Sequence, residues 1–374
     1  MARPEDSTLV TGFPSMLARR VVRAIAARGD RVLMLAQQKF ADAAQELGRA
    51  LAAEGLPGPV SVLVGDVMNL DLGLSGKELK RVSRDVRRIH HAAGISFAGA
   101  APALVERVNV EGTRNLLDVA AELGDIERVV VYSTAFVAGD RTGVVMEADL
   151  EAGQHFRSAF ESSKYEAERV ARNRMSALPI CVVRPSLVVG DSVTGEVDRL
   201  DGPYALVRWI LSAPADLHLP LGEAADHPLN VVPVDFVAAA AEAIGRAPAG
   251  AGRTFHLTDP NPLPVHAFVA EVMRAAGRRA DRDSLPSRLF ERLSLLPLVG
   301  ERILPQGVFL RDHGRPTVFN CANAIEALAG SSIRCPPFPS YAGAIVRHTR
   351  ARIEAEASAR AARNAVTEDE DAYS

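Results

Sequence analysis

Short apolar runs rich in β-branched residues alternate with amphipathic stretches through the first half of the chain. This alternation predicts βαβ units, whose parallel strands are buried on both faces and form nearly continuous apolar runs. Val129, Val130 and Val131 make up one such run, and apolar residues at helical spacing mark residues 18–27 and 112–121. We therefore predict an α/β fold with a doubly wound parallel sheet, whose strands lie at residues 7–10, 31–36, 60–65, 89–92, 128–134 and 180–189.

After residue 191 the alternation gives way to proline-rich connections. A short strand at 230–234, a helix at 236–245 and a strand at 255–258 return the chain to the sheet. The tail is rich in Ala, Arg and Glu and ends in acidic residues, so we expect a solvated helix that becomes disordered. The predicted parts are a sheet domain of residues 1–191 completed by 229–259, a smaller interleaved substrate cap of residues 192–228 and 260–345, and a tail of residues 346–374.

Composition excludes several classes of function. With 48% apolar residues the chain can bury a sizeable core, and its formal net charge of −3 gives no basic field for nucleic acid. The three cysteines have neither metal-ligand nor disulfide-framework spacing, and no apolar signal core or long apolar run is present, so we expect a soluble, cytoplasmic protein. His227, His256 and His313 lack metal-binding spacing, so no metal is expected, and the absence of a Gly-x-Ser-x-Gly motif argues against a serine hydrolase.

Five short signatures follow one another between Thr11 and Asp191. They are Thr11-Gly12, Gly65-Asp66, HAAG at residues 91–94, NVEGTRN at residues 109–115, and Tyr132-Ser133-Thr134 followed by Lys164. Their order and spacing resemble the extended short-chain dehydrogenase/reductase family, whose members bind NAD(P) on a Rossmann-type doubly wound sheet. Later segments, such as VRPS at 183–186 and HLTDP at 256–260, are similar to the branch of fatty acyl-CoA reductases and thioester reductase domains.

The loop after the first predicted strand is expected to hold a dinucleotide. A strand before the turn and a helix after it are the required context, because glycines let the backbone approach a pyrophosphate at a helix N-terminus. Of the family's three glycines only Gly12 is present, and Ser15 and Ala18 occupy the other positions. A loop that no longer binds nucleotide is the alternative. The resemblance implies a cofactor site of Thr11, Gly12, Ser15, Met16, Leu17, Lys39, Asp66, Val67, Ala92, Ala93, Gly94, Lys164, Pro185, Ser186 and Val188.

The end of the second predicted strand bears on the choice of nucleotide. A carboxylate there would accept the 2′-hydroxyl of NAD and repel the extra phosphate of NADP, but residues 35–39 are Leu-Ala-Gln-Gln-Lys. Lys39, with Arg19 as a second cation, therefore favours NADP(H) over NAD(H), although a lysine after a strand is often only solvated. The resemblance gives Asp66 a contact with adenine. A helix N-cap is its alternative role, and the two are compatible.

The resemblance also implies catalytic residues. Thr134 takes the hydroxyl role that polarises the substrate oxygen, with Ser133 as its less favoured substitute. Lys164 holds the nicotinamide ribose, and Asn109 supports a water relay. Each has a structural alternative: Thr134 could end a strand, Lys164 could be a solvated helix residue, and Asn109 could cap a helix that begins at the next residue.

Phe160 stands where the family has the tyrosine that exchanges a proton with the carbonyl. A phenyl ring cannot donate a proton, and general acid–base catalysis typically contributes about 10²–10⁴ in rate. Tyr165 is not a ready replacement, because neighbours on a helix point about 100° apart, and Tyr132 is expected on the other side of its strand. Three interpretations stay open: protonation through Thr134 and a water held by Lys164, a substrate that needs little acid help, or binding without turnover.

Two functions from different classes follow. The first is an NADPH-dependent reductase of a small hydrophobic carbonyl or acyl substrate, such as an acyl thioester, an aldehyde or a ketone. The second is a nucleotide-binding pseudoenzyme that senses or scaffolds. An epimerase or dehydratase would share the same frame, but its sugar-nucleotide contacts cannot be identified in the predicted cap.

Two further expectations concern partners. Residues 285–310 combine apolar side chains with prolines, as an apolar lid would, or an ordinary core helix with a loop, and membrane contact is not expected. The family's dimers imply a homodimer that pairs through helices at residues 112–121 and 158–175.

Overall fold

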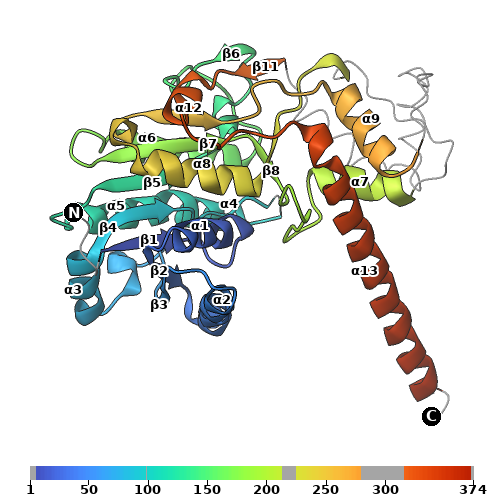
Figure 1. Ribbon diagram of the computed structural model, residues 1–374, viewed down its shortest axis with the longest axis horizontal. Coiled ribbons are helices and arrows are strands. Elements are labelled where there is room, and N and C mark those ends of the chain that lie inside the picture. The colour runs from blue at the N-terminus through green and yellow to red at the C-terminus, as the bar shows by residue number, and fades with distance from the viewer. Residues whose placement is uncertain (1–5, 98, 213–224, 279–315, 372–374) are drawn as a thin grey trace. The chain divides into compact units, whose positions relative to one another are not determined.

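The computed structural model describes residues 6–97, 99–212, 225–278 and 316–371, and their side chains as far as residue 360 (Figure 1). The chain forms two compact units. Every residue predicted for the site lies in the first. The first unit comprises Met1–Val188, Val231–Pro260 and Thr317–Cys335, and the second comprises Val189–Asn230, Asn261–Pro316 and Pro336–Ser374.

The first unit is built on a seven-stranded sheet in which all neighbouring strands are parallel. Its strand order is β10-β7-β5-β4-β1-β2-β3, so the chain winds outward from β1 in both directions. The predicted doubly wound α/β fold is thereby confirmed. The strands are β1 Ser7–Thr11, β2 Arg31–Ala36, β3 Val60–Val64, β4 Val86–His91, β5 Arg128–Tyr132, β7 Ile180–Pro185 and β10 Thr254–Leu257.

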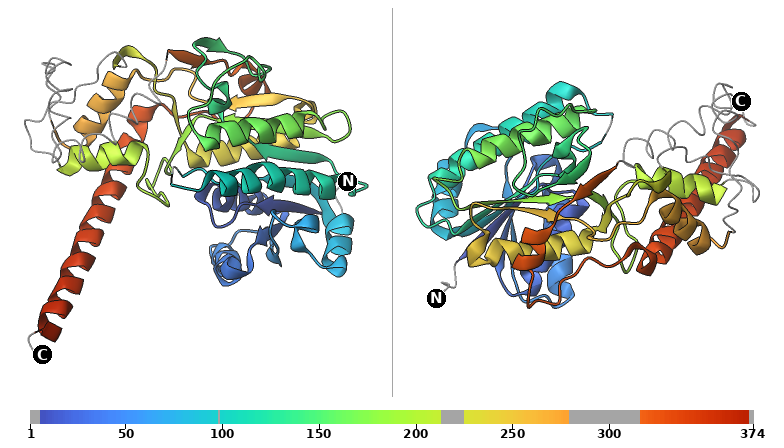
Figure 2. Two further views of the ribbon diagram at one scale, coloured as in Figure 1. Left: turned by 180° about the vertical axis from the view of Figure 1, so that it is seen from behind. Right: turned by 90° about the horizontal axis from the view of Figure 1, so that it is seen from above.

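Helices cover both faces of this sheet (Figure 2). Successive residues of a strand point to opposite faces, so each central strand contributes side chains to both cores. Val130 belongs to the core that α1 (Met16–Ala27) and α8 (Val234–Arg246) cover. Its neighbours Val129 and Val131 belong to the core on the other face, under α5 (Gly112–Ala121). The unit also contains α2 Ala41–Ala53, α3 Gly76–Asp85, α4 Pro102–Glu106, α6 Ala159–Arg172 and α12 Ala322–Ala327.

The strand predicted at residues 180–189 is interrupted after Pro185. Proline lacks the N–H that a sheet ladder needs, so strands commonly end at it. The chain continues as β8 (Leu187–Val189), which pairs with β9 (Val231–Pro233) in a separate two-stranded sheet. A second small sheet, which the sequence did not predict, joins β6 (Gly143–Val145) and β11 (Thr317–Phe319) in parallel.

Strand β4 begins at Val86, three residues before the predicted start. Arg87 and Arg88 occupy strand positions and interrupt the apolar pattern. Arg87 pairs with Asp6 at 3.3 Å and Arg88 with Glu127 at 3.0 Å. Because these ion pairs neutralise the two arginines, charged residues can occupy the first part of β4. Apolar periodicity alone does not predict such a strand start.

The second unit contains α7 (Pro203–Ser212), α9 (Val265–Ala275) and α13 (Ala342–Asp371). Helix α13 starts at Ala342, before the predicted tail boundary at residue 346. The side chains of Val346 and Thr349 are buried, so the first turns of the predicted tail are packed and not solvated. Residues 285–310 and His313, for which the sequence gave expectations, lie outside the described residues.

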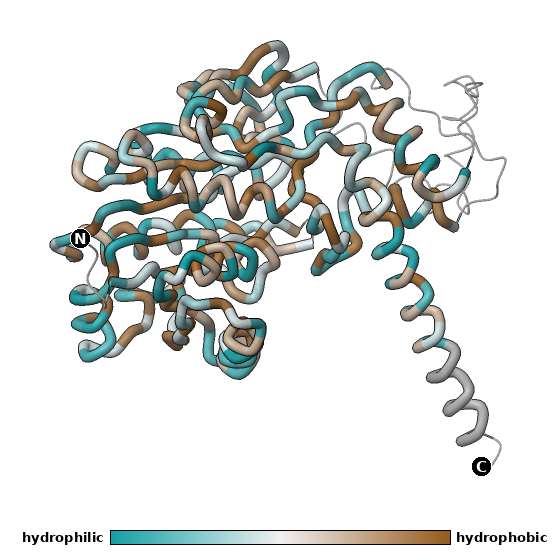
Figure 3. Tube along the Cα trace, in the orientation of Figure 1, coloured by the Kyte–Doolittle hydropathy of each residue, from teal (hydrophilic) through white to brown (hydrophobic). Residues whose placement is uncertain are grey.

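None of the described helices is long and apolar enough to cross a membrane. Helix α13 is the longest of them, and it mixes hydrophilic and hydrophobic residues along the part that is coloured in Figure 3.

Candidate functional site

The loop between β1 and α1 lies against the end of β4. Gly12 has a φ of +102°, and a Cβ on it would come within 2.6 Å of the Ala92 backbone, so a side chain at this position would clash. Ser15 is the N-cap of α1, and its hydroxyl accepts a hydrogen bond from the Ala18 N–H at 3.3 Å. The serine that replaces a family glycine therefore stabilises the start of the helix.

Gln37 and Asp66 join the ends of β2 and β3. The Gln37 amide donates to one Asp66 carboxylate oxygen at 2.7 Å, and the other oxygen accepts from the Met68 N–H at 2.9 Å. Asp66 closes a turn, and the N-caps of the next two helical segments are Asn69 and Ser75. The alternative role of Asp66 as a helix N-cap is therefore wrong.

A buried series of hydrogen bonds connects the cofactor loop with α5. We call it the His91 chain, and its members are Thr11, His91, Thr113 and Asn109. The Ala93 N–H donates to Thr11 Oγ1 at 3.2 Å, and this oxygen lies 2.9 Å from His91 Nδ1. On the other side of the ring, Nε2 lies 3.0 Å from Thr113 Oγ1, which donates to the Asn109 carbonyl oxygen at 2.6 Å.

Asn109 lies in a π-helical turn, η3 (Arg107–Glu111), between α4 and α5. Its Oδ1 accepts from the Ile95 N–H at 2.8 Å, while Nδ2 donates to the Ile95 carbonyl at 3.2 Å and to Ser163 Oγ at 2.9 Å. Because the helix continues through this residue, its alternative role as a helix cap is wrong. π-helical turns inside helices occur frequently at functional sites.

Lys164 points from α6 to the end of β5. Its Nζ donates to the Tyr132 carbonyl oxygen at 2.8 Å. A Cβ on Gly94 would lie 2.9 Å from this Nζ and 3.1 Å from Asn109 Oδ1, so the structure brings Gly94, Asn109 and Lys164 together. Burial lowers the pKa of Lys164 to about 8, although the carboxylate of Glu168 acts to raise it. Its alternative as a solvated helix residue is therefore wrong.

The neighbouring hydroxyls Ser133 and Thr134 have different partners. Thr134 Oγ1 donates to the Pro185 carbonyl oxygen at 3.4 Å and accepts from the Phe136 N–H at 3.3 Å, so it caps the short helix η4 (Ala135–Ala138). Ser133 Oγ donates to Glu168 Oε2 at 2.6 Å in the interior. The Ser133 hydroxyl, the predicted substitute for Thr134, is thus held by a buried carboxylate.

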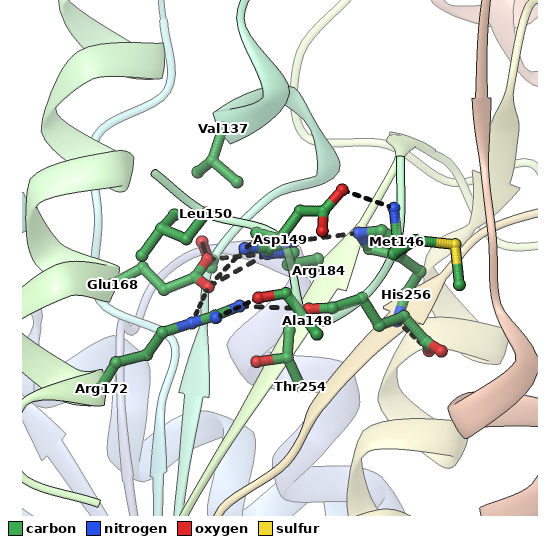
Figure 4. Close-up of polar contacts among 12 residues, drawn as sticks. Val137, Met146, Ala148, Asp149, Leu150, Glu168, Arg172, Arg184, Thr254 and His256 are labelled. Atoms are coloured by element: carbon green, nitrogen blue, oxygen red, sulfur yellow. Dashed lines mark hydrogen bonds and ion pairs between the residues drawn. The ribbon is translucent and has the colours of Figure 1, made fainter. Parts of the chain in front are cut away.

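That carboxylate is the centre of the Glu168 cluster, whose members are Ser133, Glu168, Arg172 and Arg184. Figure 4 shows Glu168 with its two arginines. Glu168 and Arg184 are 2.7 Å apart, with side chains 0% and 1% exposed, and Arg172 approaches Glu168 at 2.8 Å. Arg184 also donates to His256 Nε2 at 3.2 Å. Burial opposes the ionisation of Glu168, but the two arginines outweigh it and hold its pKa below the ordinary value.

Sequence reasoning assigned no role to Glu168 or Arg184. Glu168 follows Lys164 by four residues on a helix. This spacing is typical of charged pairs on a solvent-exposed helix face, so the sequence alone predicts a surface residue. The useful signal was Arg184, because an arginine within an apolar strand needs a buried partner.

Neither of the two tyrosines considered as replacements for Phe160 has a ring directed to its position. The Tyr132 hydroxyl lies 3.0 Å from His90 Nδ1, and its ring belongs to the core under α1 and α8, on the face opposite to that of Val131. The Tyr165 ring packs on Phe156, with centroids 4.9 Å apart. Phe160 is half-buried one helical turn before Lys164.

The remaining predicted cofactor residues line the ends of the strands. Met16 is buried and Leu17 half-buried in the first turn of α1, and Val67 packs against Gly112 of α5. Lys39 is exposed, with its Nζ 4.9 Å from the centroid of the Phe40 ring. Beyond β7, the Ser186 N–H donates to the Leu257 carbonyl oxygen at 3.3 Å, and Val188 packs against the core.

Comparison with known proteins agrees with this arrangement. The NAD-binding family described as male sterility protein matches residues 10–241. The terminal R domain of a myxalamid PKS-NRPS pathway has a similar structure, with a TM-score of 0.77 at 24% identity over 93% of this chain and 91% of that one. At this identity the likeness shows the fold alone.

Two curated relatives have related sequences. A fatty acyl-CoA reductase of Drosophila melanogaster is 23% identical over 204 residues, which span 47% of this chain and 39% of that protein. The 4-hydroxy-2-methyl-3-oxo-4-farnesyl-3,4-dihydroquinoline-1-oxide ketoreductase of Stigmatella aurantiaca is 26% identical over 283 residues, 75% of this chain and 76% of that protein. The chain therefore spans less than half of the acyl-CoA reductase that it matches.

Proposed function

Because this chain belongs to the male sterility family of NAD-binding, extended short-chain reductases, we propose that it reduces a hydrophobic carbonyl with a hydride from NADPH. The substrate is an acyl thioester, an aldehyde or a ketone. Relatives named as an acyl-CoA reductase and a ketoreductase support this substrate class.

The observation that carries the proposal is the convergence of Gly94, Asn109 and Lys164 beside the Gly12 loop. In open α/β sheets, ligands bind at the carboxyl ends of the strands. Gly12 and Gly94 let the segments at this edge approach one another closely, since a Cβ on either would come within 3.0 Å of its neighbours. This narrow, glycine-lined edge, with the N-terminus of α1 above it, fits a dinucleotide.

The chain's residues have distinct tasks in this scheme. Bound NADPH would supply the hydride. The Lys164 ammonium would hold the nicotinamide ribose, and Asn109 keeps the backbone at Ile95 in place by two hydrogen bonds. Thr134 orients the substrate oxygen when its weak 3.4 Å bond to Pro185 is exchanged for the ligand.

Proton supply is the unusual part of the scheme. With Phe160 at the tyrosine position, the proton comes from a water held by Lys164. Burial lowers the pKa of the Lys164 ammonium to about 8. An ammonium group with a pKa near the working pH can restore the proton that the water gives away.

The preference for NADPH rests on the end of β2. Gln37, where a carboxylate would select NAD, offers an amide that Asp66 holds at 2.7 Å. The exposed Lys39 lies two residues further on and can meet a 2′-phosphate. The substrate side has exposed apolar residues after Gly94, because Phe97 and Leu104 are 38% and 39% exposed. A cytoplasmic location and a homodimer paired through α5 and α6 complete the proposal.

The test is to incubate the purified protein with NADPH and a panel of acyl-CoA thioesters, long-chain aldehydes and ketones, and to follow NADPH consumption. We expect slow oxidation with one class, which Lys164→Met abolishes. Phe160→Tyr should raise the rate by about tenfold or more, since a positioned general acid typically contributes about 10²–10⁴.

The pseudoenzyme alternative makes the opposite prediction. It requires that NADPH binds while wild type and Phe160→Tyr both leave every substrate unreduced. It is not favoured, because two relatives that match this chain are named as reductases.

A further inference from the structure

His91 contacts both the cofactor loop and the turn that carries Asn109, yet the proposed reaction assigns it no task. The ring is buried, with 1% of its surface exposed. One nitrogen contacts Thr11, which precedes Gly12, and the other contacts Thr113, which donates to the Asn109 carbonyl. A single side chain therefore spans two parts of the site that are far apart in sequence.

The direction of each hydrogen bond in the His91 chain follows from its last acceptor. The Asn109 carbonyl can only accept, so the one hydroxyl hydrogen of Thr113 is used there. Thr113 Oγ1 must then accept from His91 Nε2–H at 3.0 Å. A neutral imidazole carries one proton, so Nδ1 is an acceptor and receives the Thr11 hydroxyl hydrogen at 2.9 Å.

The beginning of the chain agrees with this order. Thr11 Oγ1, having donated its hydrogen, accepts from the Ala93 N–H at 3.2 Å. Every donor meets one acceptor, whereas the opposite tautomer would leave two acceptors, His91 Nε2 and Thr113 Oγ1, facing each other without a hydrogen between them. Buried polar groups without partners are costly, so the Nε2–H tautomer is selected.

Protonation of the ring would break this order. A proton on Nδ1 would displace the Thr11 hydroxyl hydrogen, which would lose its acceptor. Burial lowers the pKa of His91 to about 3, and the positive charge of Lys164 contributes in the same direction. The ring is therefore neutral at physiological pH.

We propose that His91 is a positioning residue: as the neutral Nε2–H tautomer, it fixes the Thr11–Gly12 loop relative to the π-helical turn at Asn109. This inference rests on the proposed function, because the two parts that it joins are the predicted cofactor loop and a predicted catalytic residue. A small misplacement of either part weakens the dinucleotide site, since the loop packs so closely that a Cβ on Gly12 would lie 2.6 Å from the backbone of Ala92.

His90 provides a matched control. It precedes His91 on β4 and points to the opposite face of the sheet, where its Nδ1 lies 3.0 Å from the Tyr132 hydroxyl. It is equally buried, and burial lowers its pKa to about 3 as well. The two histidines thus differ mainly in what they touch.

The experiment measures NADPH affinity by calorimetric titration of the full chain, with the folded fraction checked by circular dichroism. His91→Phe removes both hydrogen bonds and should weaken NADPH binding about tenfold or more. His91→Gln, whose amide offers one acceptor and one donor, should recover part of the affinity. His90→Phe should bind NADPH within about twofold of wild type while losing similar stability.

A second pair of variants covers the case in which His91→Phe fails to fold. Thr113→Val keeps the shape but removes the link to His91, and should weaken NADPH binding; Thr113→Ser keeps the hydroxyl and should not. Imidazole ¹⁵N NMR of wild type should show protonated Nε2 and unprotonated Nδ1 for His91.

Three results would contradict the inference: unchanged NADPH affinity in His91→Phe and Thr113→Val, equal losses in the His90 and His91 variants, or the Nδ1–H tautomer in wild type. A wild-type protein that binds no nicotinamide nucleotide would contradict the proposed function instead. The tautomer measurement still reports on the hydrogen-bond order in that case.

Discussion

Two buried polar groups interact electrostatically with Lys164, one through His91 and the other through Glu168, and they are built differently. The His91 chain consists of neutral side chains that each donate or accept in one fixed direction. The Glu168 cluster consists of a carboxylate and two guanidinium groups, with Ser133 as its contact to the end of β5. The interior therefore positions site residues in two ways: by the fixed direction of the hydrogen bonds in the His91 chain, and by opposite charges in the Glu168 cluster.

The two groups should therefore respond differently when they are broken. Removing one member of a buried ion pair leaves an uncompensated charge, so the loss appears mainly in stability. Removing a member of the neutral chain leaves weaker defects, and the loss appears in the geometry of the site.

The largest effect is expected for Glu168→Gln. The amide keeps the size of the carboxylate but leaves Arg184 buried without a counter-charge, so the free energy of unfolding should fall by about 3–5 kcal/mol in urea titration. Glu166→Gln is the control, because Glu166 pairs with Arg169 at 2.7 Å on the surface and should cost less than about 1 kcal/mol. Similar losses for the two variants would contradict the assignment of the ion pair as a stabilising centre.

As the pH falls, the stability that His91 contributes should be lost at a higher pH than the stability that Glu168 contributes. The pKa of His91 is about 3 in the folded protein, below its unfolded value of about 6.5. Between these two values the unfolded chain binds a proton on this ring and the folded chain does not. Stability is then lost as pH falls below 6.5, by about 1.4 kcal/mol per pH unit, or about 2 kcal/mol at pH 5. Glu168 has a lowered pKa, so its contribution stays complete above about 4.5 and is lost only in stronger acid.

The measurement is urea unfolding of wild type and His91→Gln between pH 7 and pH 5. His90 and His256 contribute with the same sign, since burial lowers the pKa of each to about 3. The difference between the two proteins isolates His91, and the variant should show the shallower pH dependence. Equal slopes would show that His91 is not neutral and buried as described.

The smallest effect concerns Lys164, which interacts electrostatically with both groups. Burial lowers its pKa to about 8, so the ammonium is lost as pH rises above that value. NADPH affinity should then fall by about 1 kcal/mol, roughly fivefold, between pH 7 and pH 9. Lys164→Met should bind more weakly and show no such dependence in the same titrations. A pH dependence that survives in Lys164→Met would assign the effect to another group.

Much of the fold could be predicted because the central strands are apolar and bounded by turns. Val129–Val131 sits between two cores, as its continuous apolar pattern indicates. The start of β4 was overlooked because Arg87 and Arg88 interrupt that pattern. The break after Pro185 was missed although proline marks such an end.

The site was predictable only where a motif names the residue. Lys164 and Asn109 were placed by family spacing, and the structure brings them together through Gly94. One hydrogen bond of the His91 chain joins residues 80 positions apart, and no local pattern reveals such a link. The sequence around Glu168 is typical of a surface residue, and its burial depends on Arg184, which comes from another element.

The most direct test of the central claim is calorimetric titration of the purified chain with NADPH, NADP, NADH and NAD. The account predicts saturable binding, tighter for NADPH than for NADH, and weakened in Lys164→Met. Absence of binding for all four nucleotides would contradict it, because the glycine-lined edge at Gly12 and Gly94 would then hold no cofactor.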